Sequence, residues 1–335
     1  MEKDPKDLCG KYMKKGIVIG KFYPPHKGHK YLIETACSHV DKLTVIVCDN
    51  RTQKISAQLR AVWLKEMIPK ADVIVVDDCL DDNDSKGWAE YTVKTLGYIP
   101  DAVFTSEDYG ERYAGFMGAK HYLIDKERIH VPISASQIRN NPLKHWDYLE
   151  PCVRAYFAKR VCVVGAESTG TTTMATALAE HYKTTWVPEY GRLYTDAKMK
   201  LKNASEWKTD EFVFIAKKQN ELEDQLARIC NKILICDTDS FATTLWHERY
   251  LGFISPEVDA IGMGRYYDLY FLTDNDIPFV QDGTRDGEHI RDNMHKRFKE
   301  ELKKRGKHYV LLSGSHAGRM KIAVEACDKI LDVIL

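Results

Sequence analysis

The sequence of 335 residues lacks both a long apolar run and a net charge. No stretch approaches the ~18 apolar residues that a membrane-spanning helix needs, and the N-terminus has no apolar signal core. The 49 basic and 49 acidic residues cancel, so overall charge gives no reason to expect binding to nucleic acid or to a membrane. We therefore predict a soluble protein with neither kind of partner.

The nine cysteines are irregularly spaced, with no CxxC pair and no regular disulfide framework. Cys48, Cys162 and Cys236 lie in apolar, strand-like runs, where reduced cysteine behaves as a small core residue. An odd number of cysteines at irregular spacing favours a reducing compartment. A cytoplasmic location is therefore predicted.

Strand and helix signals alternate along the chain. The predicted strands cover 16–20, 42–49, 71–78, 101–108 and 119–125, and, in a second series, 160–165, 184–190, 232–239, 267–274 and 308–314. Helical spacing of apolar residues fills most of the intervals, which is typical of parallel sheets covered by helices. The sequence thus predicts an α/β protein with two parallel-sheet, three-layer domains.

Residues 141–159 read as a connector, because Asn-Asn-Pro is followed by aromatic helical turns before the second series of strands begins. We predict an N-terminal domain over 1–155, which starts with an extension over 1–15. A C-terminal domain is predicted over 156–335. Active sites of such sheets lie beyond the carboxyl ends of the strands.

The first segment with chemical content is GIVIGKFYPPHKGH, 16–29, which runs from a strand through a loop into a helix. His26 and His29 are three residues apart, so both rings lie on one face if the helix begins near His26. At a helix N-terminus, two imidazoles can bind phosphate oxygens as negative charge builds up. Gly28 leaves room for a nucleotide, and Lys21 can add positive charge. Without further support, two histidines at this spacing are more often polar surface residues than part of a binding site.

A second segment, PISASQIRNNP over 132–142, supports the first, because it offers serine helix caps followed by an arginine. Together the two segments resemble the HxGH nucleotidyltransferase superfamily, which has a Rossmann-like domain. The resemblance implies direct in-line attack of an acceptor phosphate on the α-phosphorus of ATP, with pyrophosphate leaving. The catalytic residues that it implies are His26, His29, Lys21 and Arg139, and the ATP-binding residues are Gly20, Phe22, Gly28, Ser134 and Ser136. Ser136 stands where the superfamily usually has threonine.

The acceptor is indicated by Trp88 and by SEDYGERYAG over 106–115. These resemble the nicotinamide mononucleotide (NMN) adenylyltransferases of the NadR family, in which an aromatic ring stacks on the cationic nicotinamide. The resemblance implies that Trp88, Ser106 and Tyr109 bind NMN. Taken alone, Trp88 is more often a core aromatic, and another acceptor, such as pantetheine phosphate, stays open. Arg51 and Arg60 are further candidates.

The segment VCVVGAESTGTTT, 161–173, is a second strand, glycine loop and helix start. Gly165 to Thr172 matches the phosphate-loop (P-loop) pattern GxxxxGK[ST], except that Thr171 replaces the lysine. That lysine normally reaches the β- and γ-phosphates. Asp237 and Asp239 follow a buried strand and suit Mg²⁺, although such carboxylates also serve as helix caps.

The marks GxESxG and EYxR resemble the ribosylnicotinamide kinase half of the NadR family, and the whole resemblance covers about residues 15 to 330. It implies that Glu189 takes the 5′-hydroxyl proton of nicotinamide riboside, with Asp237 as metal ligand or base. Arg285 and Arg291 can close over the phosphates as a lid. The expected ATP-binding residues are Gly165, Glu167, Ser168, Thr169, Gly170, Thr171, Thr172, Thr173, Arg285, Arg291 and Arg319. The expected metal ligands are Thr172, Asp237 and Asp239.

The resemblance implies a bifunctional NAD-salvage enzyme that phosphorylates nicotinamide riboside to NMN and adenylylates NMN to NAD. Its expected ligands are Mg²⁺, ATP, NMN, nicotinamide riboside and NAD, and its expected assembly is a homo-oligomer. Because Thr171 replaces lysine, two alternatives stay open: an adenylyltransferase with a degenerate or regulatory P-loop domain, and a nucleotide sensor. Some family members begin with a helix-turn-helix; only about fifteen residues precede the first strand here, so no DNA binding is expected.

Overall fold

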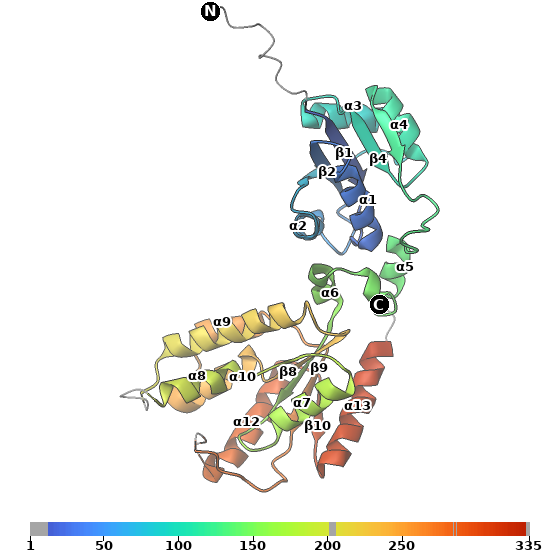
Figure 1. Ribbon diagram of the computed structural model, residues 1–335. Helices are drawn as coiled ribbons and strands as arrows, with labels where there is room; N and C mark the ends of the chain where they lie inside the picture. Colours follow the sequence, from blue (N-terminus) through green and yellow to red (C-terminus); the bar gives the residue numbers. More distant parts are fainter. Residues whose placement is uncertain (1–12, 201–205, 284, 286, 333–335) are drawn as a thin grey trace, which may run out of the picture. The chain divides into compact units, whose positions relative to one another are not determined.

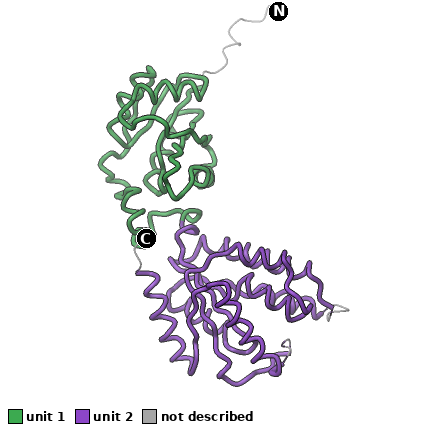
Figure 2. Tube along the Cα trace, turned by 180° about the vertical axis from the view of Figure 1, so that it is seen from behind, with its two compact units in different colours: residues 1–153, 335 green, residues 154–334 purple. Residues whose placement is uncertain are grey.

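Every predicted strand forms in the computed structural model, which describes residues 13–200, 206–283, 285 and 287–332. The chain divides into two compact units, one ending at Val153 and the other starting at Arg154 (Figure 2). Each unit holds one five-stranded parallel sheet with helices packed on it (Figure 1). The predicted α/β class with two parallel-sheet domains is confirmed. Of the predicted extension over 1–15, residues 1–12 lie outside the described part.

The first sheet has the order β3-β2-β1-β4-β5. Its strands are β1 (Lys15–Gly20), β2 (Lys42–Asp49), β3 (Asp72–Asp77), β4 (Ala102–Thr105) and β5 (Lys120–Leu123). The helices are α1 (Lys27–Cys37), α2 (Ala57–Met67), α3 (Ser85–Leu96), α4 (Tyr109–Met117) and α5 (Ala135–Asn140). Neighbouring residues of a strand point to opposite faces, so Val18 packs with α1 and α2 while Ile17 packs with α3 and α4.

The predicted connector contains a 3₁₀ turn, η2 (Trp146–Tyr148), and the helix α6 (Pro151–Phe157). The second sheet follows, with the order β10-β9-β6-β8-β7. Its strands are β6 (Lys159–Val164), β7 (Trp186–Val187), β8 (Ile233–Asp237), β9 (Leu269–Thr273) and β10 (Tyr309–Leu312). The helices are α7 (Thr171–His181), α8 (Tyr190–Lys198), α9 (Thr209–Leu226), α10 (Ser240–Leu251), α11 (Pro256–Met263), α12 (Arg291–Lys304) and α13 (His316–Asp332), with the 3₁₀ turn η3 (Glu288–Ile290) before α12.

The two units have separate apolar cores. One core cluster of the first unit is built around Val18 and Phe104. In the second unit, α7 and α13 cover one face of the sheet in a cluster that contains Val161 and Phe271. None of the described helices has both the length and the apolar character that crossing a bilayer would take.

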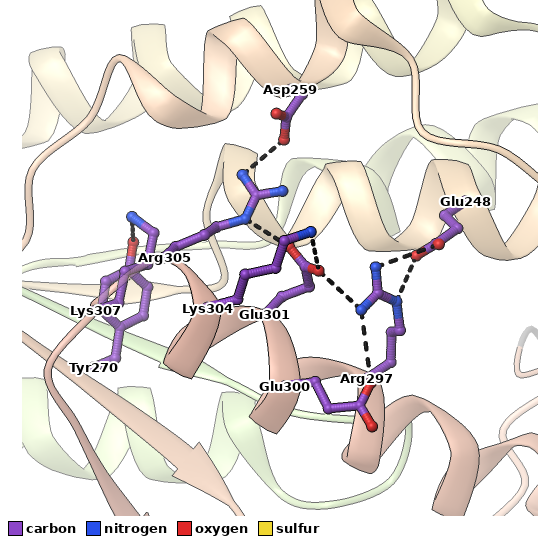
Figure 3. A network of polar contacts seen from close by, with 9 residues as sticks. All are labelled: Glu248, Asp259, Tyr270, Arg297, Glu300, Glu301, Lys304, Arg305 and Lys307. Atoms are coloured by element: carbon purple, nitrogen blue, oxygen red, sulfur yellow. Dashed lines mark hydrogen bonds and ion pairs between the residues drawn. The ribbon is translucent and has the colours of Figure 1, made fainter.

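A buried acidic residue ties α12 to its neighbours (Figure 3). The side chain of Glu301 is 1% exposed and binds three cations, Arg297 at 2.9 Å, Arg305 at 2.8 Å and Lys304 at 3.3 Å. Arg305 reaches Asp259 on α11 at 2.7 Å, and Arg297 reaches Glu248 on α10 at 2.8 Å. The network therefore connects three helices through one carboxylate.

Parallel strands bring loops from distant parts of the sequence to one edge of each sheet. In the first unit the strand order reverses between β1 and β4, and the loops after these strands leave on opposite sides. In the second, the loops after β6, β7 and β8 leave at the same edge. Ligands of open α/β sheets bind at such edges.

Candidate functional site

The first unit has a cavity of about 540 Å³ beyond the carboxyl ends of β1 and β4. Eight of the predicted site residues line it: Gly20, Lys21, Phe22, His29, Trp88, Ser106, Tyr109 and Arg139. Phe22 is buried with a left-handed φ of 46°, a strained conformation for a large side chain that is often found at functional sites. His26, Gly28, Ser134 and Ser136 lie outside the lining of the cavity.

The two histidines of the HxGH segment stack on each other, with ring centroids 3.8 Å apart. His26 is the N-cap of α1, and its Nδ1 accepts a hydrogen bond of 3.0 Å from the amide of Gly28. Burial, and then the charge of Arg128, lowers the pKa of His26 to about 3, and burial lowers the pKa of His29 well below its usual range. Both rings are therefore neutral at physiological pH. Nδ1 of His29 is buried without a hydrogen-bond partner.

Gly28 has a structural role beside the His26 ring. A Cβ at this position would lie 2.9 Å from Cε1 of His26, which is closer than side-chain contacts allow. The glycine therefore makes room for the imidazole that caps the helix.

Arg139 joins the two predicted segments. One guanidinium nitrogen donates to the backbone carbonyl of Tyr23 in the loop after β1, and the other donates to the hydroxyl of Ser136 at 2.8 Å. Ser134 caps α5 in a reciprocal capping box with Gln137. Ser134 thus caps the helix that carries Arg139, Ser136 accepts from its guanidinium, and the arginine itself lines the cavity.

At the predicted acceptor end, Trp88 is 8% exposed and its Nε1 donates to the carbonyl of Asp81 at 3.1 Å. The hydroxyl of Tyr109 donates to the carbonyl of Ile19 at 3.1 Å. Sequence reasoning missed Asp78 and Asp82, which line the cavity and bind Lys21 at 3.5 Å and 3.0 Å.

The other candidates of this unit do not reach the cavity. Arg60 is fully buried and donates to the carbonyls of Ile55 at 3.1 Å and Cys48 at 3.3 Å, so it supports the fold. Arg51 is exposed and lies outside the cavity lining.

The second unit has a cavity of about 320 Å³ at the edge where β6, β7 and β8 end. Eight of the predicted residues line it: Gly165, Glu167, Ser168, Thr171, Thr172, Glu189, Asp237 and Arg285. Thr169, Gly170 and Thr173 are not among its lining residues. The buried hydroxyl of Thr169 bonds the carbonyl of Ala166 and the hydroxyl of Thr273, both at 2.7 Å, and so fixes the shape of the loop.

The hydroxyl of Thr172 donates to Oδ2 of Asp237 at 2.5 Å, while Oδ1 of Asp237 is buried without a partner. Burial raises the pKa of Asp237 to about 6. Burial, together with the charge of Asp237, raises the pKa of Glu189 to about 8. An unpartnered carboxylate oxygen beside a hydroxyl fits a divalent cation with oxygen ligands. No group of three or more His, Cys, Asp or Glu within the described ranges forms a complete metal cage.

Three predicted residues have structural partners instead of a place in this cavity. Asp239 is fully buried, caps α10 through the amide of Ala242 at 2.9 Å, and accepts from the hydroxyl of Tyr270 at 2.6 Å. Arg291 donates to the carbonyl of Ser168 at 3.0 Å, and Arg319 donates to that of Thr169 at 2.7 Å. Both arginines are buried and support the phosphate loop from outside the cavity.

Sequence reasoning also missed an aromatic wall of this cavity. Its members are Trp186, Trp207, Phe212, Trp246 and Tyr250. They come from β7, the segment before α9, α9 and α10, so no short motif contains them. An aromatic wall of this kind suits a flat ring.

Comparison with known proteins gives matches along the chain. The model of the Cytidylyltransferase-like family matches residues 17–181, and that of the AAA domain family matches residues 160–319. The Trifunctional NAD biosynthesis/regulator protein NadR of Escherichia coli is 30% identical over 81% of this chain and 71% of its own length. The protein of the same name from Salmonella typhimurium is 31% identical over the same shares.

Two solved structures share the fold over nearly the whole chain. A NadR protein in complex with NAD and AMP-PNP has a TM-score of 0.76 at 22% identity and covers 97% of this chain and 98% of its own. A NadR protein in complex with NR has a TM-score of 0.77 at 22% identity, and the match covers 96% of this chain and 97% of its own. The two curated relatives, at 30% and 31% identity over four fifths of this sequence, show that the chain belongs to the NadR family.

Proposed function

We propose that the chain catalyses two consecutive steps of NAD formation, one in each domain. The domain over 156–335 transfers the γ-phosphate of ATP to nicotinamide riboside and forms NMN. The domain over 1–155 joins NMN to the adenylyl group of ATP, which forms NAD and releases pyrophosphate. The observation that carries this proposal is the presence of two separate cavities, one beside the stacked histidines and one beside the phosphate loop.

In adenylyl transfer, the protein positions two polyanions and stabilises charge at the α-phosphorus. The neutral imidazole of His29 lines the cavity, and the ring of His26, which does not line it, stacks on His29 and orients it. His29 is therefore the group that donates a hydrogen bond to a phosphate oxygen. Lys21 and Arg139 supply positive charge. Trp88 offers its ring to the cationic pyridinium of NMN, with Ser106 and Tyr109 beside it.

In riboside phosphorylation, Glu189 accepts the proton of the 5′-hydroxyl as that oxygen attacks the γ-phosphorus. Its raised pKa suits this role, because a base is most effective when its pKa lies near the working pH. The aromatic wall receives the nicotinamide ring. Mg²⁺ bound to Thr172 and Asp237 would offset charge on the phosphates of ATP.

Two assays on one purified preparation test the proposal. With ATP, Mg²⁺ and nicotinamide riboside, we expect ADP and NMN, and with added NMN we expect NAD and pyrophosphate. NAD from NMN without any ADP from the riboside would instead indicate a single active domain. Tight NAD binding with no turnover in either assay would indicate a sensor.

A further inference from the structure

The cavity of the second unit is short of positive charge for a site that holds a nucleoside triphosphate. Thr171 occupies the position of the phosphate-loop lysine and has no charge. Among the described residues that line the cavity, Glu167, Glu189 and Asp237 are acidic, and the cations are Arg192 and Arg285. Any charge that replaces the lysine from within this lining must come from these two arginines.

Both arginines bind the same carboxylate. Arg192, on α8, donates from Nη2 to Oδ2 of Asp282, and Nε of Arg285 lies 3.2 Å from the same oxygen. Asp282 comes from the segment after β9, about ninety residues from Arg192 in sequence. One acidic oxygen that holds two guanidinium groups is the arrangement that a phosphate oxygen would also favour.

The segment that carries Asp282 is attached to the phosphate loop. The amide of Val280 donates to the hydroxyl of Ser168 at 2.9 Å, and Arg291 donates to the carbonyl of Ser168 at 3.0 Å. Nη1 of Arg285 donates to the carbonyl of Val280. These bonds place the arginine pair next to the loop before any nucleotide arrives.

We propose that Asp282 positions Arg192 and Arg285 as a paired phosphate-binding group that replaces the missing lysine of the phosphate loop. Arg192, Arg285 and Asp282 together carry a net charge of +1, which equals that of one lysine ammonium. Asp196 also lies 3.9 Å from Nε of Arg192, but its side chain is 48% exposed, so solvent screens its charge. The arginines contact the β- and γ-phosphates, and Asp282 is a positioning residue that keeps them close together despite their mutual repulsion. This inference rests on the proposed kinase activity.

The decisive experiment moves the charge back to the loop. Arg285→Gln should lower kcat/KM for riboside phosphorylation by ~10²-fold, since a phosphate-binding arginine is typically worth at least that much. Adding Thr171→Lys to Arg285→Gln should recover ~10-fold or more of the loss, because the lysine then supplies the charge. ADP release measures this reaction alone, since adenylyl transfer releases pyrophosphate. Arg285→Gln within twofold of the parent, or no recovery in the double variant, would overturn the inference.

Asp282 is tested separately. Asp282→Asn should raise the KM for ATP ~10-fold with a smaller change in kcat, and Asp282→Glu should restore most of the affinity. Lys217→Gln removes an exposed charge from α9 and should change neither constant. An unchanged KM for ATP in Asp282→Asn, with an unchanged melting temperature, would show that Asp282 has no such role.

The single variant Thr171→Lys separates this inference from the kinase proposal. An inactive parent that gains ADP release through Thr171→Lys would mean that the arginines do not replace the lysine, although the site is a kinase. If the parent and Thr171→Lys both release no ADP, the kinase function itself fails and this inference fails with it.

Discussion

The hydroxyl of Thr172 lies 2.5 Å from one carboxylate oxygen of Asp237, and the second oxygen of that carboxylate is buried without a hydrogen-bond partner. If Mg²⁺ binds this second oxygen, Asp237→Asn should lower the rate of riboside phosphorylation ~10²-fold. It should also raise the Mg²⁺ concentration that half-maximal activity requires. Titration of ADP release with Mg²⁺ measures the effect. An unchanged Mg²⁺ midpoint would show that Asp237 is not a metal ligand. As a control, the rate of adenylyl transfer should be unaffected by this substitution.

Loss of the His29 imidazole should lower adenylyl transfer ~10²-fold or more in His29→Ala, because a donor to the transition state disappears. Pyrophosphate release from ATP and NMN measures this step. His39→Ala, an exposed histidine just beyond α1, is the matched control and should keep full activity. An unchanged rate of adenylyl transfer in His29→Ala, or a loss of rate that is accompanied by a lower melting temperature of the first unit, would contradict this role.

The two reactions should differ in their pH dependence. Glu189 must be deprotonated to act as a base, and its pKa is raised to about 8, so kinase kcat/KM should rise with pH up to about 8 and then level off. The pKa of His26 is lowered to about 3 and that of His29 is also lowered, so the HxGH rings add no titration near neutral pH, and adenylyl transfer should be flat above about pH 7, where the attacking phosphate of NMN (second pKa of about 6) is fully ionised. Rate profiles of both reactions over this range measure the difference. A kinase rate that does not change between about pH 6 and 8 would contradict a raised pKa of Glu189 in the working site.

Trp88→Phe should raise the KM for NMN by several-fold, because a phenyl ring attracts a pyridinium less strongly than an indole does. Trp88→Ala should raise it further, ~10-fold or more. Trp88 also belongs to the apolar core, so melting temperatures must accompany the kinetics. The acceptor is not NMN if the KM for NMN stays the same in a folded Trp88→Ala protein.

The network around Glu301 predicts a stability change. Burial alone would raise the pKa of Glu301, but hydrogen bonds from Arg305 and Arg297 lower it below its usual range. Glu301→Ala leaves these cations without their shared partner and should lower the free energy of unfolding by about 2 kcal/mol or more at neutral pH. The lowered pKa means that this stabilisation is present above the unfolded pKa of about 4.3 and is lost as the pH falls below it.

Urea unfolding of Glu301→Ala and Glu300→Ala at neutral and acidic pH measures this contribution. The side chain of Glu300 is 70% exposed and its nearest cation is 3.7 Å away, so its removal should leave stability nearly unchanged. Similar losses in both variants, or a loss in Glu301→Ala that does not shrink at acidic pH, would contradict the prediction.

Strands with strong apolar character could be predicted closely, and the run over 42–49 coincides with β2. The strand predicted over 184–190 is only two residues long in the structure. It lies at the edge of the sheet, and Pro188 has no amide to donate. Helix α4 was missed, since Gly110 and Gly115 lower its helical propensity. The structure shows why Gly110 is there: a Cβ would lie 2.2 Å from the hydroxyl oxygen of Thr105. Such a contact cannot be seen in local sequence.

The same distinction applies to the sites. The phosphate loop is continuous in sequence, so its spacing identified Gly165 and Thr172. Asp78 and Asp82 come from a different loop than their partner Lys21, and Asp282 is still more remote in sequence from Arg192. Pairings of this kind depend on the order of strands in the sheet, which no short motif encodes.

The core cluster around Val18 and Phe104 and the cluster around Val161 and Phe271 share no residue. A substitution that removes a large side chain from one of these cores therefore leaves the apolar packing of the other core intact. We expect heating to melt such a mutant in two stages, with the intact half still able to turn over its own substrate. Damage to this protein should then abolish one chemical step at a time.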